Sequence, residues 1–190
     1  MPRTRTDTKH RILTAANRLF YAEGIRAVSV DAVAEKAKIT KKTLYYHFRS
    51  KDDLVTEYLK SRDQPNLDAF RTWFDAADGG LTDQVYAIFE GVARGAKHPK
   101  WRGCGFLRTA GELASTPGHP AVKAGAAHKK RFEKWLEETF AAAGAAAPAT
   151  LARRVTLLLE GAFAASLIHR DATYILEAGE AARDMVALST

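Results

Sequence analysis

The chain has 190 residues, 46% hydrophobic and 27% charged, so it can bury one or two ordinary cores and is not a disordered tail. No run of about eighteen apolar residues occurs, and the first residues lead into a charged segment, which argues against a membrane span or an apolar signal segment. Cys104 is the only cysteine, which excludes an intrachain disulfide and agrees with a reducing compartment. We therefore expect a cytoplasmic protein in which a small domain is joined to a larger one.

The net charge of +7 is concentrated at one end of the chain. Residues 1–60 hold 13 Lys and Arg against 7 Asp and Glu, a net +6, whereas residues 61–190 hold 16 against 15, a net +1. A basic end on a nearly neutral body is typical of a protein that meets a polyanion with that end. A membrane surface is the competing polyanion, but no helix pairs a basic face with a broad apolar face that lacks a core. The charge distribution therefore favours nucleic acid.

The first predicted helix begins at Thr6 or Asp7 as N-cap and ends at Gly24. Its apolar residues recur on one face at helical spacing, so we interpret it as scaffold. The basic residues near its start are an exception, because they can reach a phosphate or the minor groove. These residues are Arg3, Arg5 and Lys9.

Residues 28–53 predict a helix-turn-helix with a further helix behind it. The first of these helices has an apolar stripe at three- and four-residue steps, formed by Val30, Val33, Ala34 and Ala37, and Ser29 or Asp31 as its N-cap. A tight turn follows at 38–40, and Thr40 can cap a second helix from Lys41 to His47. The inward side of this helix is Leu44 and, past its end, Phe48.

The outward side of the second helix is polar and basic, which suits a major groove better than a protein core. Lysines at its start can donate to guanine O6 and N7, and Thr43 can meet a base edge. Tyr45, Tyr46 and His47 would donate to phosphates, and Lys51 begins the next helix, where backbone amides and the macrodipole favour a phosphate. The alternative is a solvated basic face, since helix-turn-helix shapes also occur in proteins that never touch DNA.

The string SVDAVAEKAKITKKTLYYHFRSKDDL resembles the N-terminal motif of the tetracycline-repressor (TetR) type of transcriptional regulator. The resemblance extends from Thr8 to about Leu54, while the rest of the chain is similar only in its helical layout. It implies an all-α homodimeric repressor that a small ligand releases from its operator. It also implies base-facing Lys41, Lys42 and Thr43, and phosphate-facing Thr40, Tyr45, Tyr46, His47 and Lys51.

Two residues depart from the family pattern. Lys38 stands where the turn usually has glycine, and a non-glycine residue in the left-handed conformation costs roughly 1 kcal/mol. Lys42 stands where many members have glycine, so the base contacts can differ from those of better-known members.

The remainder of the chain predicts helices only. Asp52 and Asp53 open a fourth helix that Pro65 kinks or interrupts, with a helical period resuming at 66–77. Further helices are predicted at 82–97, 106–114, 120–143 and 150–169, and from Asp171 onward. The predicted fold is therefore all-α, with a three-helix DNA-binding domain at 1–50 and a ligand-binding and dimerisation domain at 51–190.

The helix at 150–169 is apolar nearly all round, so more than one of its sides must be covered. Its glycine and alanines allow close approach of a second helix, and we predict a homodimer joined through the last two helices. The predicted interface residues are Leu157, Gly161, Ala164, Ile168, Ile175 and Met185.

Aromatic residues gather in the C-terminal body, which suits an apolar ligand held by a few polar groups. The candidate ligand-binding residues are Trp73, Phe74, Phe89, Phe106, Trp135 and Phe163, although ordinary core packing is the commoner role of any single one. Candidate polar anchors are Arg108, Glu112, His128 and His169.

Patterns of catalysis and metal binding are missing. The six histidines form no i, i+4 pair and no HExxH, and the strings GxGxxG, GxxxxGK[ST] and GxSxG do not occur. We therefore predict no catalytic residue, no metal and no cofactor. Cys104, near Arg102 and Arg108, is a candidate redox or electrophile sensor, although a buried apolar cysteine is the commoner case.

These patterns together predict a ligand-responsive transcriptional regulator, in the first place a repressor, that binds palindromic operator DNA as a homodimer. A small, largely apolar effector would release it. One alternative is a ligand-independent architectural DNA-binding protein. Another is an enzyme that carries a helix-turn-helix, which the missing catalytic residues disfavour.

Overall fold

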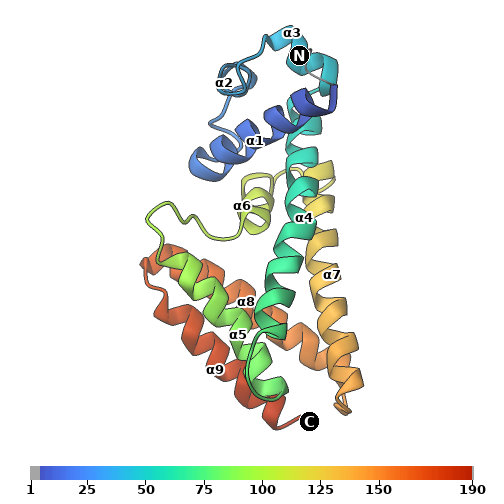
Figure 1. The fold of residues 1–190 in the computed structure, drawn as a ribbon, viewed down its shortest axis with the longest axis vertical. Helices are drawn as coiled ribbons and strands as arrows, with labels where there is room; N and C mark the ends of the chain where they lie inside the picture. The colour runs from blue at the N-terminus through green and yellow to red at the C-terminus, as the bar shows by residue number, and fades with distance from the viewer. Residues whose placement is uncertain (1–4, 190) are drawn as a thin grey trace. The chain divides into compact units, whose positions relative to one another are not determined.

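The structure, a computed structural model, describes the backbone of residues 5–189 and the side chains from Thr6 onward. Over this range the chain forms nine helices and no strand, which confirms the all-α prediction (Figure 1). The helices are α1 (Arg5–Glu23), α2 (Val30–Lys36), α3 (Lys41–His47), α4 (Lys51–Asp75), α5 (Leu81–Ala96), α6 (Gly105–Glu112), α7 (Pro120–Ala142), α8 (Pro148–His169) and α9 (Thr173–Ala187).

The helices divide between two compact units. The first consists of the described part of Met1–Gln64 together with Gly105–Ala126, and the second of Pro65–Cys104 together with the described part of Ala127–Thr190. Helices α4 and α7 each contribute residues to both units.

The core of the first unit is built from the residues that the helical spacing predicts. Leu44 of α3 and Phe48 beyond it are 0% and 1% exposed, as expected for the inward side of the second helix of the motif. They share this core with Ile12 and Phe20 of α1 and Val33 of α2, all buried. Each such side chain contributes roughly 1.5–3 kcal/mol when fully buried, so packing against α1 holds the two short helices that could not persist alone.

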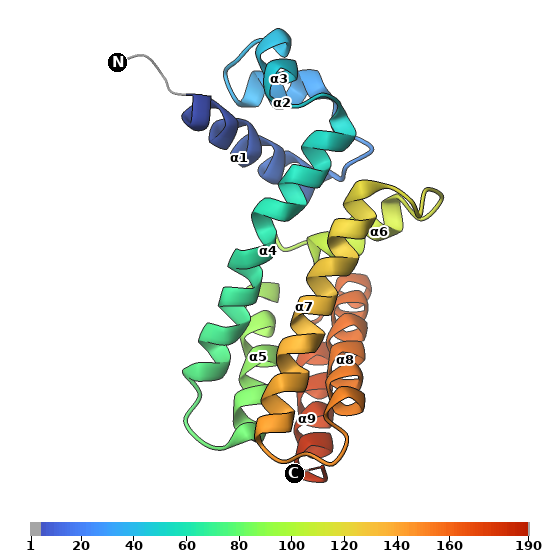
Figure 2. The same cartoon turned by 90° about the vertical axis from the view of Figure 1, so that its right-hand side faces the viewer.

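Helix α4 runs without interruption through Pro65, so the predicted interruption is wrong, whereas the kink stays a prediction (Figure 2). A proline inside a helix costs about 3 kcal/mol, because it removes one hydrogen bond and clashes with the preceding turn. Apolar residues on both sides offset this cost: Leu59 before the proline, and Leu67, Phe70 and Phe74 after it, are buried.

Close packing in the second unit joins α9 to both α5 and α8. Gly179 of α9 lies so near α5 that an added Cβ would be 2.8 Å from the Cβ of Phe89, so only glycine fits. Arg153 of α8 pairs with Glu133 of α7, Nε to Oε1 3.4 Å. Phe70 of α4 contacts Phe132 of α7 with ring centroids 5.0 Å apart.

Several helix starts differ from the predicted ones. Helix α1 begins at Arg5, so neither Thr6 nor Asp7 is its N-cap, and α5 and α6 each begin one residue before the predicted start. Helix α8 begins at Pro148 and not at Thr150, because a proline at the first helical position lacks only an N–H that has no partner there anyway. Helix α9 begins at Thr173 and not at Asp171, since the Asp171 carboxylate accepts a hydrogen bond from the Thr173 N–H at 2.8 Å and so precedes the helix.

Candidate nucleic-acid interface

Two side-chain caps define the helix-turn-helix. The Ser29 hydroxyl accepts a hydrogen bond from the Ala32 N–H at 3.0 Å, which selects Ser29 from the two predicted caps of α2. The Thr40 hydroxyl accepts from the Thr43 N–H at 3.1 Å and so caps α3, as predicted. Each cap satisfies an otherwise unpaired donor and contributes about 1 kcal/mol.

The turn between the two helices has the left-handed residue that the sequence indicates. Lys38 has a φ of 55°, which confirms that a lysine occupies the conformation for which glycine is favoured. The Lys38 N–H donates to the Glu35 carbonyl at 2.9 Å, and the Ile39 N–H donates to the Ala34 carbonyl at 3.0 Å. This pair of hydrogen bonds is a Schellman motif, which ends α2 and sets the start of α3.

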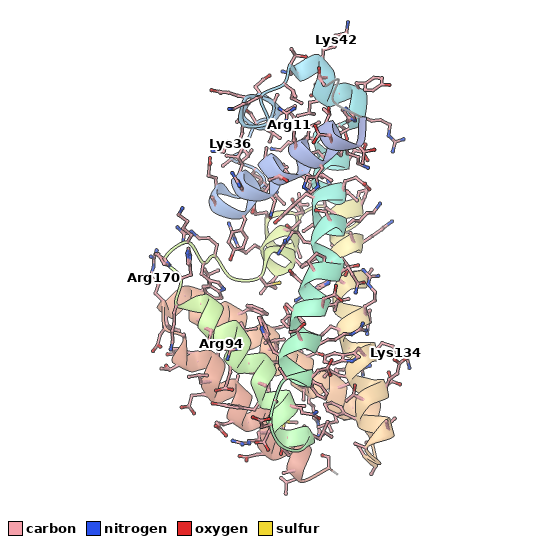
Figure 3. The ribbon with its side chains drawn as sticks, viewed as in Figure 1. Arg11, Lys36, Lys42, Arg94, Lys134 and Arg170 are labelled. Atoms are coloured by element: carbon pink, nitrogen blue, oxygen red, sulfur yellow. The ribbon has the colours of Figure 1, made fainter. Side chains whose placement is uncertain are left out.

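The outward side of α3 presents four large polar side chains to solvent. Lys42, Tyr45 and Tyr46 are exposed, with 44% and 67% of the two tyrosines accessible. Figure 3 shows Lys42 projecting from α3 away from α1. Lys41 is also exposed, but its Nζ lies 2.9 Å from Oδ2 of Asp31 on α2. The hydrogen bond to Asp31, followed by the charge of that carboxylate, raises the pKa of Lys41, so this amine is held toward α2.

The other predicted phosphate-facing residues lie at the two ends of α3 and at the start of α4. The Thr40 hydroxyl is engaged by Thr43 at 2.9 Å as well as by its amide. His47 is half-buried, and its ring centroid is 5.3 Å from that of Tyr46. Lys51 is the first residue of α4 and is half-buried. The arrangement brings all eight predicted DNA-facing residues into the first unit.

The basic residues near the start of α1 contribute less positive charge to this surface than the sequence suggests. Arg3 and the side chain of Arg5 lie outside the described residues. The Lys9 ammonium lies 3.1 Å from Oε2 of Glu57, so its charge is partly neutralised within the chain. Lys60 first, and Lys9 in addition, lower the pKa of Glu57.

The predicted ligand-binding residues are divided between the units. Phe106 belongs to the first unit, and the other five belong to the second. Within the second unit, Phe74 and Trp135 are in edge contact with ring centroids 5.3 Å apart. Phe89 is fully buried, and Trp73 lines an open cavity of about 390 Å³. The same cavity is lined by Tyr86, Glu90, Arg94 and Arg183 of α5 and α9, which were not among the predicted ligand-binding residues.

The four candidate anchors are engaged within the protein. Arg108 donates to the Tyr21 carbonyl at 2.7 Å, and Glu112 accepts from the Arg26 N–H at 2.9 Å, so both tie together parts of the first unit. His128 is 1% exposed, and the ring of His169 stacks on Tyr174 with centroids 4.6 Å apart.

Cys104 is buried, as the commoner interpretation of the sequence expected. Its sulfur accepts a hydrogen bond from the Lys129 Nζ at 3.3 Å, and the same ammonium forms an ion pair with Glu160. Lys129 lies 25 residues further along the chain, so no local spacing could have revealed this contact.

The predicted interface residues differ in their accessibility. Leu157 and Ile168 of α8 are 64% and 74% exposed, and Gly161 is exposed as well. Ala164 and Met185 are half-buried. Ile175 is 0% exposed, so its side chain belongs to the core of the second unit and is not available to a partner. Ile175 follows the apolar spacing of α9 as well as its neighbours do, which is why sequence alone did not separate it from the surface.

No helix in the described part of the chain combines the length and apolar character needed to cross a bilayer.

Comparison with known proteins identifies the class to which this arrangement belongs. Residues 12–58 match the family model "Bacterial regulatory proteins, tetR family". The crystal structure of SCO4454, a TetR-family transcriptional regulator from Streptomyces coelicolor, is 30% identical with a TM-score of 0.83, covering 96% of this chain and 97% of that one.

Two curated regulators from Pseudomonas putida match a shorter stretch. The HTH-type transcriptional regulator SrpR is 36% identical over 88 residues, which are 43% of this chain and 41% of SrpR. The HTH-type transcriptional regulator TtgW is 36% identical over 88 residues, which are 43% of this chain and 65% of TtgW. The match therefore spans less than two thirds of the length of either regulator.

A capped helix-turn-helix with an exposed polar recognition helix, followed by a helical body, defines a helix-turn-helix regulator of transcription. The chain belongs to the TetR family of transcriptional regulators, as the resemblance of its N-terminal motif predicted. SrpR, TtgW and SCO4454 are all named as transcriptional regulators.

Proposed function

We propose that this regulator is a ligand-responsive repressor that binds palindromic operator DNA as a homodimer and is released by a small, largely apolar effector. The observation that carries the proposal is the outward side of α3, where Lys42, Tyr45 and Tyr46 are exposed while Leu44 is fully buried. Residues 1–50 would bind DNA, and residues 51–190 would bind the ligand and the second protomer.

An exposed apolar stripe on α8 supports the homodimer. Leu157, Gly161, Ala164 and Ile168 follow one another at steps of four, three and four residues, which places them on one face of the helix. Large apolar side chains with most of their surface in water are stabilised when a second copy covers them. The glycine and the alanine allow the two copies of α8 to approach closely.

A symmetric dimer would present two copies of α3 related by a dyad. Such a pair enters successive major grooves about 34–36 Å apart, so the operator is expected to be an inverted repeat with half-sites about one turn apart. Lysine at position 42 would contact base edges, and Lys51 would contact a phosphate.

Helix α4 supports a coupling between ligand and DNA. It is continuous from Lys51 to Asp75 and contributes to both compact units. A ligand that shifts helices of the second unit can therefore change the separation of the two copies of α3 in the dimer. The ligand must bind the DNA-incompetent state better, and a differential of roughly 1–3 kcal/mol weakens operator binding about 5- to 150-fold.

The proposal is tested by selecting duplexes from a randomised pool with the full-length protein. We expect enrichment of an inverted repeat. Salt-dependent binding without sequence preference would instead favour an architectural DNA-binding protein.

The effector is sought by a thermal-shift screen of small apolar molecules, since a compound that binds only the native protein raises its melting temperature. Calorimetry with and without the selected duplex then measures the coupling. Linkage requires that the duplex weaken binding of the compound by the same factor as the compound weakens binding of the duplex, so equal affinities would remove the proposed ligand response.

A further inference from the structure

The turn that places the recognition helix contains a conformation that its residue does not favour. Lys38 holds a φ of 55°, where a side chain other than glycine or asparagine is strained. Two backbone hydrogen bonds of the Schellman motif pair the carbonyls of Ala34 and Glu35. The carbonyls of Ala37 and Lys38, which come next in the chain, take no part in these two hydrogen bonds.

A guanidinium from another helix donates to these two carbonyls. Nη2 of Arg11 on α1 donates to the Ala37 carbonyl and, at 3.3 Å, to the Lys38 carbonyl. Arg11, labelled on α1 in Figure 3, is half-buried. The next residue, Ile12, is 0% exposed and anchors this part of α1 in the core. Its positive charge lies at the C-terminal end of α2, where the helix macrodipole favours a cation.

We propose that Arg11 is a positioning residue for DNA reading: it holds Lys38 in the left-handed conformation and so fixes the direction in which α3 leaves the turn. The inference rests on the proposed function, because its readout is the sequence preference of DNA binding. In this chain Arg11 takes the place of the glycine that would adopt the turn without help.

The surroundings of Arg11 separate this role from a simple contribution of charge. Arg11 lines an open groove of about 350 Å³ together with Arg18, Lys36 and Lys38, and none of the lining side chains is acidic. Arg18 is exposed and pairs with no carboxylate in the described part of the chain. It therefore carries the same charge on the same helix, while the hydrogen bonds to the turn carbonyls come from Arg11, which makes Arg18 the matched control.

A guanidinium is suited to this role in a way that an ammonium is not. Both hydrogen bonds come from one nitrogen, Nη2, whose two N–H groups are held in the rigid plane of the guanidinium, whereas a lysine ammonium is a flexible, strongly hydrated point charge. Arg11→Lys thus keeps the charge and most of the aliphatic stem but loses the pair of hydrogen bonds to the Ala37 and Lys38 carbonyls.

The experiment measures affinity of the full-length protein for two duplexes of equal length, the inverted repeat recovered by selection and a shuffled version of it. The variants are Arg11→Ala, Arg11→Lys, Arg18→Ala, Lys38→Gly and the double variant Arg11→Ala with Lys38→Gly. The quantity compared is the affinity for the selected repeat divided by the affinity for the shuffled duplex. For Arg11→Ala we expect this ratio to fall about fivefold, the factor that corresponds to the strain of one left-handed residue. Arg18→Ala should weaken both duplexes alike and leave the ratio unchanged.

The double variant decides between positioning and other roles. Glycine adopts a φ of 55° freely, and water can reach the two carbonyls in the open groove, so adding Lys38→Gly to Arg11→Ala should restore the ratio. Lys38→Gly alone should keep it. The proposal is overturned if Arg11→Ala behaves as Arg18→Ala on both duplexes, or if the double variant stays as low as Arg11→Ala.

Loss of folding does not obscure the test. Arg11→Lys is expected to fold and to lower the ratio in the same direction, so an unchanged ratio in this variant also overturns the proposal. Failure of the proposed function itself would be recognised earlier, because the unaltered protein would then select no motif.

Discussion

A charge placed on the exposed apolar stripe of α8 is expected to separate the two protomers. Ile168 and Leu157 have 74% and 64% of their surface in water, so about two thirds to three quarters of the burial free energy of each is still available for a partner. Full burial of such a side chain is worth about 1.5–3 kcal/mol, which leaves roughly 1–2 kcal/mol for each. Because a symmetric interface contains each residue twice, Ile168→Asp removes roughly 2–4 kcal/mol and raises the dissociation constant about 30- to 1,000-fold.

Sedimentation over a concentration series measures this constant directly. The control is Ala141→Asp, which places the same charge at an exposed position on α7 away from the stripe. We expect Ile168→Asp and Leu157→Asp to dissociate while the control and the unaltered protein remain dimeric at micromolar concentration. A monomeric unaltered protein would refute the dimer, and a dimer that tolerates both charges would show that the interface lies elsewhere.

Four further substitutions test the helix-turn-helix. Lys42→Ala should relax sequence preference, because this lysine is expected to contact base edges. Lys51→Ala should weaken binding to all sequences alike and reduce the slope of log affinity against log salt by about 1. If the two variants had the same effects on the shuffled and the selected duplex, the assignment of Lys42 to bases and Lys51 to a phosphate would be contradicted. Asp31→Asn should strengthen binding to any duplex in a salt titration, because it removes a negative charge near the DNA and releases the Lys41 ammonium. Weaker binding would show instead that the ion pair with Asp31 holds Lys41 in position to contact DNA. Leu44→Ala, which empties a fully buried position, should lower the free energy of unfolding by about 2–5 kcal/mol in a denaturant titration, and a loss below about 1 kcal/mol would mean that the site collapses around the smaller residue.

Local patterns were sufficient to predict the helix-turn-helix. The caps Ser29 and Thr40 bond to amides three residues away, and the inward side of α3 repeats at the helical period, so neighbouring residues contain the whole signal. The family resemblance added Lys38 as the left-handed residue, because it showed where the turn usually has glycine.

Contacts between elements distant in the sequence were not predictable in this way. Arg11 lies 26 residues before Ala37, whose carbonyl it binds, and Asp31 holds Lys41 from the neighbouring helix. The continuity of α4 through Pro65 depends on the buried residues around it, which local propensity does not include. Ile175 is buried by packing between helices, so its apolar spacing could not distinguish core from interface.

The central claim, that two recognition helices read one inverted repeat, is tested most directly by changing the distance between the half-sites. The affinity of the full-length protein is measured for the selected repeat and for the same repeat with about five base pairs inserted at its centre, which turns one half-site to the opposite side of the duplex. We expect the insertion to abolish the preference over a shuffled duplex. Equal affinity for the two repeats would contradict this expectation, because each half-site would then be bound independently.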